Sequence, residues 1–348
     1  MLFAVCADRG APGSSTVARV LASARGLPAV VVGADAYGDD MALRVLPDGK
    51  HPMPATPTVL GIGAGKSPER PQPTRPIGLN DQRSGPRYDD LWREGSHELS
   101  PLVRVVPGFL TAEQGASASW QVLAAALEAQ NGAVFADLGR IHTGSPSMPI
   151  AAAADAIVPV CRGDQISVQT MVGRLELLVS AIAERNRRPP IVVPVVIANR
   201  RHGDAIAQAV AKILSDSAVA AAVRGVAWLA WDPAGVADLD NGRDPWAKPL
   251  RTSPLMRSAR KAMWHLGLAT GLDHAEPNVK PAAGKGKRAR TTASPGEQPR
   301  TNHAEPPQAP VAPPPSAPPP PPQPGWPRQA ANGESSPWHV PPIEESHR

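Results

Sequence analysis

The sequence LFAVCADRGAPGSSTVARVLASA, residues 2–24, decides the fold. An apolar run over 2–7 is followed by a turn of small residues and then by a stretch with helical spacing over 17–24. This order predicts a strand, a tight loop and a helix. Small residues let backbone N–H groups turn toward an anion, and the N-terminus of the following helix adds partial positive charge. The segment therefore predicts a phosphate-binding loop.

The predicted loop departs from the standard pattern at one position. A standard phosphate loop carries a lysine just before its Ser/Thr, whereas here Gly13 is followed by Ser14, Ser15 and Thr16. A second glycine-rich segment, residues 61–67, does contain a lysine. We interpret it as a decoy, because Leu60 stands where the pattern needs glycine and Pro68 follows where a helix should continue.

Apolar runs alternate with amphipathic patterns along most of the chain. Runs typical of buried strands cover 2–7, 29–33, 103–106, 133–137, 156–160, 191–197 and 225–231. Apolar residues at spacings of three and four cover 17–24, 112–130, 167–185, 203–214 and 254–268. The alternation predicts an α/β fold with a doubly wound, mostly parallel sheet that helices cover on both faces.

The composition divides the chain at about residue 272. Residues 1–272 are rich enough in Ala, Val and Leu to form one α/β domain, within which residues 46–100, rich in Pro and Gly, predict an irregular surface excursion. Almost half of the chain's 43 prolines lie in residues 273–348. This tail cannot bury enough apolar surface to offset its ordering entropy, so we expect a disordered segment. It would act either as a partner-binding proline-rich segment or as a spacer.

Charge and cysteine usage narrow the class of protein. The formal net charge of +5 is mild, and basic residues gather only at 285–290, a cluster that either contacts nucleic acid or an anionic membrane or merely solvates the tail. Cys6 and Cys161 each lie in an apolar run, which favours buried thiols over a disulfide framework or a cysteine metal site. With neither a signal-peptide pattern nor an uninterrupted apolar span, we expect a cytoplasmic protein.

Polar residues follow four of the predicted strands, where parallel sheets bind ligands. Asp137 is suited to hold Mg²⁺, which prefers oxygen ligands, but it equally suits the cap of the turn 137–139. Asn199 either hydrogen-bonds a base edge or forms an ordinary turn. Asp35 and Asp232 close the strands at 29–33 and 225–231.

Four segments carry a resemblance to a known family. They are RGAPGSST (9–16), GADAYGDD (33–40), PGFLTAEQ (107–114) and DAIVPVCR (155–162). In this order they resemble the deviant phosphate-loop ATPases of the MinD/ParA type, and more narrowly the MinD-like proteins of actinobacteria, whose loop reads Lys-Gly-Ser-Pro-Gly-Val-Thr-Thr. The resemblance covers most of residues 1–270. It implies an ATP-dependent switch that forms a nucleotide-dependent homodimer and positions or assembles a protein partner in a secretion, pilus, conjugation or partitioning system.

The resemblance also implies roles for individual residues. The cofactors would be ATP and Mg²⁺, with the metal held by the Ser15 hydroxyl and Asp137. Asp35 would lie in the first switch and orient the metal or the attacking water. Asn199 and Asp232 would face the base. The remaining nucleotide contacts would come from the loop residues Gly10, Ala11, Pro12, Gly13, Ser14, Ser15 and Thr16.

Two departures from the family bear on catalysis. The family's signature lysine, which reaches across the dimer, is Arg9 here, and the second loop lysine is Ser14. Arginine keeps the charge and suits phosphate oxygens, so Arg9 would act catalytically on the partner's nucleotide or else remain a solvated surface residue. Losing the second lysine predicts weak or absent hydrolysis. The alternative function is a non-catalytic pseudo-ATPase scaffold that recruits partners through the proline-rich tail.

The last amphipathic pattern, 254–268, also has two interpretations. It either packs against the sheet or binds a membrane surface, which would place the protein peripherally at the membrane. The spacing of Leu255, Met256, Met263 and Leu266 around Trp264 favours packing.

Overall fold

The computed structural model describes residues 1–7, 13–54, 59 and 95–274. The decoy segment at 61–67, the basic cluster at 285–290 and the proline-rich tail lie outside the described residues. The strands are β1 Leu2–Ala7, β2 Ala29–Gly33, β3 His97–Ser100, β4 Val103–Val106, β5 Ala133–Arg140, β6 Ala156–Arg162, β7 Ile191–Val192, β8 Val195–Ala198 and β9 Ala227–Ala230. The helices are α1 Ser14–Ala24, α2 Met41–Arg44, α5 Ala112–Ser117, α6 Trp120–Glu128, α7 Met148–Ala153, α8 Gln165–Asn186, α9 Gly203–Ser215, α10 Pro233–Asp240, the 3-10 turn η1 Leu250–Thr252 and α11 Pro254–Thr270.

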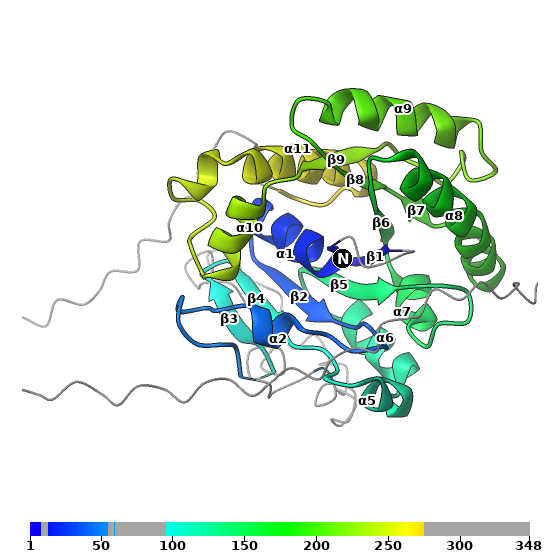
Figure 1. The fold of residues 1–348 in the computed structure, drawn as a ribbon. Coiled ribbons are helices and arrows are strands. Elements are labelled where there is room, and N and C mark those ends of the chain that lie inside the picture. The colour runs from blue at the N-terminus through cyan, green and yellow to red at the C-terminus, as the bar shows by residue number, and fades with distance from the viewer. Residues whose placement is uncertain (8–12, 55–58, 60–94, 275–348) are drawn as a thin grey trace, which may run out of the picture. The chain divides into compact units, whose positions relative to one another are not determined.

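The described strands form one sheet in the order β3-β4-β2-β5-β1-β6-β8-β9, with β7 paired to β6 (Figure 1). The named strand pairs are parallel except β3 with β4. The chain builds outward from β1 on both sides, so the crevice between the two halves lies at the carboxyl end of β1. The loop that the sequence predicts to bind phosphate follows this strand.

Successive residues of β1 enter two different cores. Leu2, Ala4 and Cys6 pack in the core that α6, α7, α8 and α9 cover, whereas Phe3 and Val5 pack in the core that α1 and α11 cover. Side chains alternate between the faces of a strand, so an unbroken apolar run is what a sheet covered on both faces requires. The predicted doubly wound, mostly parallel α/β fold is confirmed.

Several predicted boundaries were wrong for local reasons. The strand expected at 191–197 is split into β7 and β8 around Val193 and Pro194, because proline has no N–H for a ladder. The helix expected at 112–130 breaks into α5 and α6 where Ala118 adopts extended backbone. Residues 97–100, expected to be irregular, form β3, which lies at the edge of the sheet and pairs with β4. Its short antiparallel pairing has no strong periodic signature.

Two helices bear on the membrane question. By length and composition α8 meets the requirements of a membrane span. This is only weak evidence that α8 crosses a membrane, because core helices of globular proteins share both properties. Its buried apolar residues are Val168, Met171, Leu175, Leu178, Val179 and Ile182. In α11 the side chains of Leu255, Met256, Met263 and Leu266 are buried, as core packing predicts, whereas Trp264 is 40% exposed.

Candidate nucleotide site at the carboxyl edge of the sheet

Helix α1 begins earlier than the sequence predicts. Gly13 is its N-cap with φ 95°, a left-handed conformation that glycine adopts readily, and Ser14, Ser15 and Thr16 form the first helical turn instead of loop. The N–H of Val17 reaches the carbonyl of Gly13 at 2.8 Å. The preceding N–H groups have no acceptor within the helix, and Gly13 offers no capping side chain. The described part of the predicted phosphate loop therefore presents free backbone donors, while Arg9, Gly10, Ala11 and Pro12 lie outside the described residues.

Asp137 lies inside β5 and not at its end, because the strand continues to Arg140 across an irregularity at Gly139, whose φ is 56°. The carboxylate is 1% exposed. It accepts hydrogen bonds from the Ser15 and Ser14 side chains and, at 3.0 Å, from the backbone N–H of Gly139. The carboxylate therefore caps the local turn and also faces the first turn of α1, while its role in holding Mg²⁺ stays a prediction.

Burial raises the pKa of Asp137, and the hydroxyl hydrogen bonds oppose that shift only in part. Two more carboxylates lie close enough to feel its charge. Burial and then Asp137 raise the pKa of Asp39 to about 6, and burial is also the main cause that raises the pKa of Asp35 to about 6. Burial thus disfavours the ionised forms of these carboxylates, and the charge of Asp137 adds to that effect at Asp39 and Asp35.

Asp35 follows β2, as expected, and its Oδ1 accepts the N–H of Tyr37 at 2.9 Å. A Cβ on Gly139 would lie 1.8 Å from Asp35 Oδ2, so the carboxylate packs directly against β5 beyond Asp137. Tyr37 adds a second link, because its hydroxyl lies 3.1 Å from Nε2 of His142 in the loop after β5. The loop after β2, which is expected to hold the first switch, is therefore connected to the loop after β5.

Asp39 is a site residue that the sequence analysis missed. Its carboxylate accepts the N–H groups of Met41 at 2.9 Å and Gly108 at 3.0 Å, which joins the loop after β2 to the loop after β4. A Cβ on Gly33 would lie 2.0 Å from its Oδ2, so only glycine fits there. The signal was present in the segment 33–40, where two aspartates follow Gly38.

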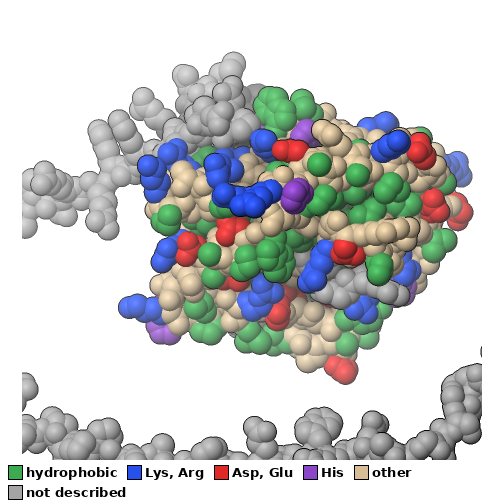
Figure 2. All heavy atoms as spheres, turned by 45° about the horizontal axis from the view of Figure 1, so that its top comes forward, with side chains coloured by type: hydrophobic (Ala, Val, Ile, Leu, Met, Phe, Trp, Pro, Cys, Tyr) green, Lys and Arg blue, Asp and Glu red, His purple; other side chains and the backbone are tan. Residues whose placement is uncertain are grey.

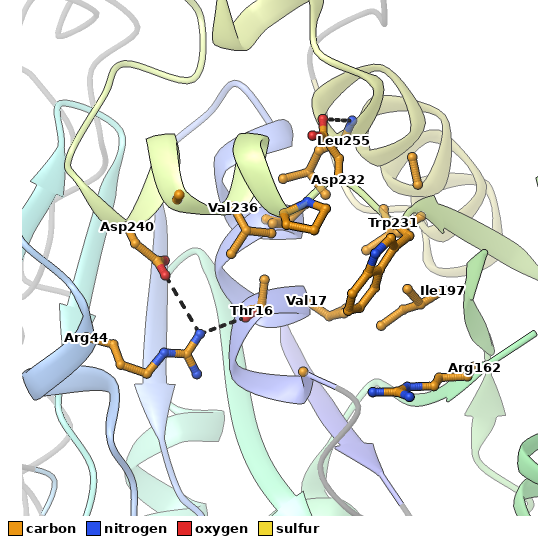
Figure 3. Close-up of a pocket in the computed structure, with 16 residues that line it drawn as sticks. Thr16, Val17, Arg44, Arg162, Ile197, Trp231, Asp232, Val236, Asp240 and Leu255 are labelled. Carbon is orange, nitrogen blue, oxygen red and sulfur yellow. Dashed lines mark hydrogen bonds and ion pairs between the residues drawn. The ribbon is translucent and has the colours of Figure 1, made fainter. Parts of the chain in front are cut away.

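A pocket of about 380 Å³ opens beside the first turn of α1 (Figure 3). Gly13, Thr16 and Arg44 lie on one side, and Arg162 and Trp231 lie on another. The apolar lining is Val17, Val20, Ile197, Leu229, Ala230, Pro233, Val236, Ala237 and Leu255. The pocket thus combines a polar end at the helix terminus with a largely apolar interior, as small-molecule sites commonly do.

The two residues expected to face a base differ in position. Asp232 lines the pocket, but its oxygens accept the N–H groups of Gly235 at 3.0 Å and Leu255 at 3.2 Å, which ties α10 to α11. Asn199 is not among the residues that line this pocket, and its Oδ1 accepts the N–H of Arg201 at 3.0 Å. This is the turn that the sequence analysis weighed as its alternative. Trp231 is 60% exposed, and the guanidinium carbon of Arg162 lies 5.8 Å from the centroid of its ring. The indole of Trp231, and not Asn199, therefore lines the pocket with a flat surface suited to a base.

Comparisons with known proteins bear on this arrangement. A scan against protein-family models and a search of curated proteins found no match. Among solved structures, the ParA family ATPase from Chlorobium tepidum TLS superposes with a TM-score of 0.53 at 16% identity, covering 76% of this chain and 98% of that chain. The cell division ATPase MinD from Pyrococcus furiosus gives 0.52 at 12% identity, covering 77% and 98%.

This chain has the ParA/MinD fold. At such low identity the likeness establishes the architecture, and residue roles must be argued from the chain's own contacts. The likeness covers the mostly parallel α/β sheet and its helices. The serines of the first α1 turn, the carboxylates and the pocket all lie at that edge.

Proposed function

We propose that the chain is a nucleotide-binding switch that takes ATP with Mg²⁺ at the carboxyl edge of its sheet. The observation that carries the proposal is the pocket of about 380 Å³ that begins at Gly13 and Thr16 and extends between β8, β9 and α10. One end offers backbone N–H donors for phosphates, and the other offers apolar and indole surface for a base. ParA/MinD architecture with this pocket favours a nucleotide over other anions.

The residues present fit Mg²⁺ bound with a nucleotide. The described residues contain no cluster of three or more His, Cys, Asp or Glu that could hold a metal alone. Mg²⁺ with nucleotides commonly uses one or two protein oxygens plus phosphates and water, and Ser15 with Asp137 supplies such a pair. When bound, the metal would neutralise phosphate charge and favour the ionised form of Asp137. Asp35 would orient the metal or a water molecule.

The degenerate loop separates binding from hydrolysis. Phosphate binding rests mainly on backbone N–H groups, including those expected from Gly10, Ala11 and Pro12. Ser14 cannot supply the charge of a lysine, and one preorganised donor is worth about 3–4 kcal/mol in a barrier. We infer slow or absent turnover unless Arg9 compensates across a homodimer. The protein would act in the cytoplasm by positioning or assembling a partner of a secretion, pilus, conjugation or partitioning system.

Isothermal titration of the full chain with ATP and with ADP, each with Mg²⁺, tests this function. We expect saturable binding that weakens without Mg²⁺ and in Asp137→Asn, because the variant lacks the charge that attracts the metal. No binding of ATP or ADP at millimolar concentration would overturn the proposal. A phosphate-release assay on the same samples then separates an enzyme, whose turnover is lost in the variant, from a binding switch without turnover.

A second candidate is a pseudo-ATPase scaffold, which the contacts of Ser14 favour. Ser14 is 2% exposed and its side chain hydrogen-bonds Asp137, so it is already engaged by the chain's own carboxylate. A scaffold of this kind would show neither binding nor turnover in the two assays. Partner capture that depends on the proline-rich tail, and not on nucleotide, would then support it.

A further inference from the structure

Arg44, the last residue of α2, reaches across to the first turn of α1. Its Nη2 donates to Oγ1 of Thr16 at 3.3 Å and lies 3.7 Å from Oδ2 of Asp240, while its Nη1 lies 3.5 Å from Oδ1 of Asp40 (Figure 3). The side chain is 39% exposed and lines the pocket. A guanidinium group therefore stands at the polar end of the candidate nucleotide site.

The contacts of Arg44 leave it able to bind an additional anion. In charge-assisted hydrogen bonds the donor nitrogen lies about 2.7–2.9 Å from the acceptor oxygen, and all three Arg44 contacts are longer. A guanidinium group has five N–H donors in a fixed fork, so a phosphate could engage donors that these carboxylates do not hold.

Arg19, in α1, also contacts Asp240 but has a different role. It is 1% exposed, forms a tight ion pair with Asp240 and donates from Nε to the carbonyl of Ser15 at 3.4 Å. Asp240 is thus already matched by Arg19, and it neutralises Arg44 only weakly. Arg19 does not line the pocket, so Arg44 is the cation that faces the cavity beside Thr16.

The second arginine of the pocket lies at another wall. Arg162 stands over the Trp231 ring at 5.8 Å, on the side of the pocket that β6, β8 and β9 form. Figure 3 shows Arg44 and Arg162 on different sides of the first α1 turn. This separation assigns the two cations to different parts of a bound nucleotide.

We propose that Arg44 binds the nucleotide phosphate nearest Thr16 and supplies there the positive charge that Ser14 lacks. This inference rests on the proposed function, because it assigns a phosphate contact at the same site. It places the compensating cation outside the phosphate loop, on the short helix after β2. The loop after β2 would then tighten against α1 when a phosphate binds.

Titration calorimetry of the full chain with Mg²⁺ and ATP, ADP or adenosine tests the assignment. Arg44→Gln removes the charge, and we expect ATP and ADP affinity to fall by roughly 10- to 100-fold, the worth of a charged hydrogen bond. Adenosine has no phosphate, so its affinity should not change. Arg44→Lys should retain part of the phosphate affinity. The matched control is Arg243→Gln, whose exposed ion pair with Asp238 lies outside the pocket and whose loss should change none of the three affinities.

A second variant, for which we expect tighter ATP binding, keeps the test independent of folding defects, because a folding defect would weaken binding. Asp40→Asn removes a carboxylate 3.5 Å from Arg44, so ATP should bind up to about fivefold more tightly with adenosine unchanged. Equal ATP affinity in wild type and Arg44→Gln would overturn the inference while leaving the proposed function intact. An equal loss of ATP and adenosine affinity would also overturn it, because that result indicates general damage to the pocket. Failure of wild type to bind any nucleotide would overturn both.

Discussion

The ion pair between Arg19 and Asp240 links α1 to α10. Arg19 is 1% exposed, whereas the Asp240 side chain is 18% exposed. Asp240→Ala leaves a buried guanidinium group with only the 3.4 Å contact to the Ser15 carbonyl. Breaking a buried pair in this way costs about 3–5 kcal/mol, and the partial exposure of Asp240 places the expected loss near 3 kcal/mol.

Urea denaturation without nucleotide, followed by tryptophan fluorescence, measures this loss as a change in the free energy of unfolding. At roughly 2–4 °C per kcal/mol, the thermal midpoint should fall by about 6–12 °C. Arg243→Gln is the matched control, because its 3.0 Å pair with Asp238 has an arginine that is 57% exposed and should contribute less than about 1 kcal/mol.

The double variant Arg19→Met/Asp240→Ala distinguishes a buried charge from lost packing. Removing both charges avoids the uncompensated guanidinium, so most of the lost stability should return. The reasoning is refuted if Asp240→Ala stays within about 1 kcal/mol of wild type, or if the double variant is no more stable than Asp240→Ala.

Three further predictions concern the carboxyl edge and its support. The fold raises the pKa of Asp35 to about 6 from its ordinary 3.8. Ionisation of Asp35 therefore lowers the free energy of unfolding increasingly as the pH rises from about 4 to about 6, and by its full amount above that. Asp35→Asn should therefore be more stable than wild type at pH 8, by about 1 kcal/mol after discounting for partial exposure, and urea melts should show the difference vanish toward pH 4. Gly115→Ala places a Cβ 2.3 Å from the Ala36 carbonyl oxygen and should cost about 1–3 kcal/mol in urea melts, whereas Gly173→Ala, whose Cβ meets nothing within 4 Å, should gain up to about 1 kcal/mol. Trp231→Ala should weaken ATP and adenosine about tenfold alike in titration calorimetry, since stacking on a base ignores the phosphates; an unchanged adenosine affinity would contradict the placement of the base.

The sequence predicts most of this fold because the sheet is buried on both faces. β1 and β2 begin and end where their apolar runs do, since each residue of such a strand must be apolar whichever face it meets. The break between α5 and α6 has no such signature. Gly115 in α5 packs against the Ala36 backbone, a contact between segments far apart in the chain that periodicity cannot reveal.

The candidate site was predictable in kind but not in detail. Asp35 and Asp137 are identifiable because polar residues at the carboxyl ends of parallel strands meet at one edge. Arg44 and Arg19 carry no local signal. Their roles depend on Asp240, which lies about two hundred residues further along the chain and approaches α1 only in the folded protein.

A further feature of the molecule is how its charged side chains are distributed over the surface. Figure 2 shows Lys and Arg side chains interspersed with Asp and Glu on the face that it presents. On that face of the described residues no broad basic stripe appears of the kind that follows a nucleic-acid backbone. Contact with nucleic acid or an anionic membrane through residues 285–290 stays a prediction.

The missing lysine changes the electrostatics of the site as well as its catalytic prospects. Ser14 hydrogen-bonds Asp137 but carries no charge that would offset that carboxylate. Burial is the main cause of the raised pKa values of Asp39 and Cys6, and the charge of Asp137 raises both further. A lysine would place a permanent positive charge near Asp137, whereas serine places none. On our proposal, Arg44, which donates to Thr16, would bind a nucleotide phosphate. Asp137 would thus balance the charge of the metal, and Arg44 would balance the charge of a phosphate. The stability of this edge of the sheet would then depend on the bound ligand more strongly than in a protein whose loop contains the lysine.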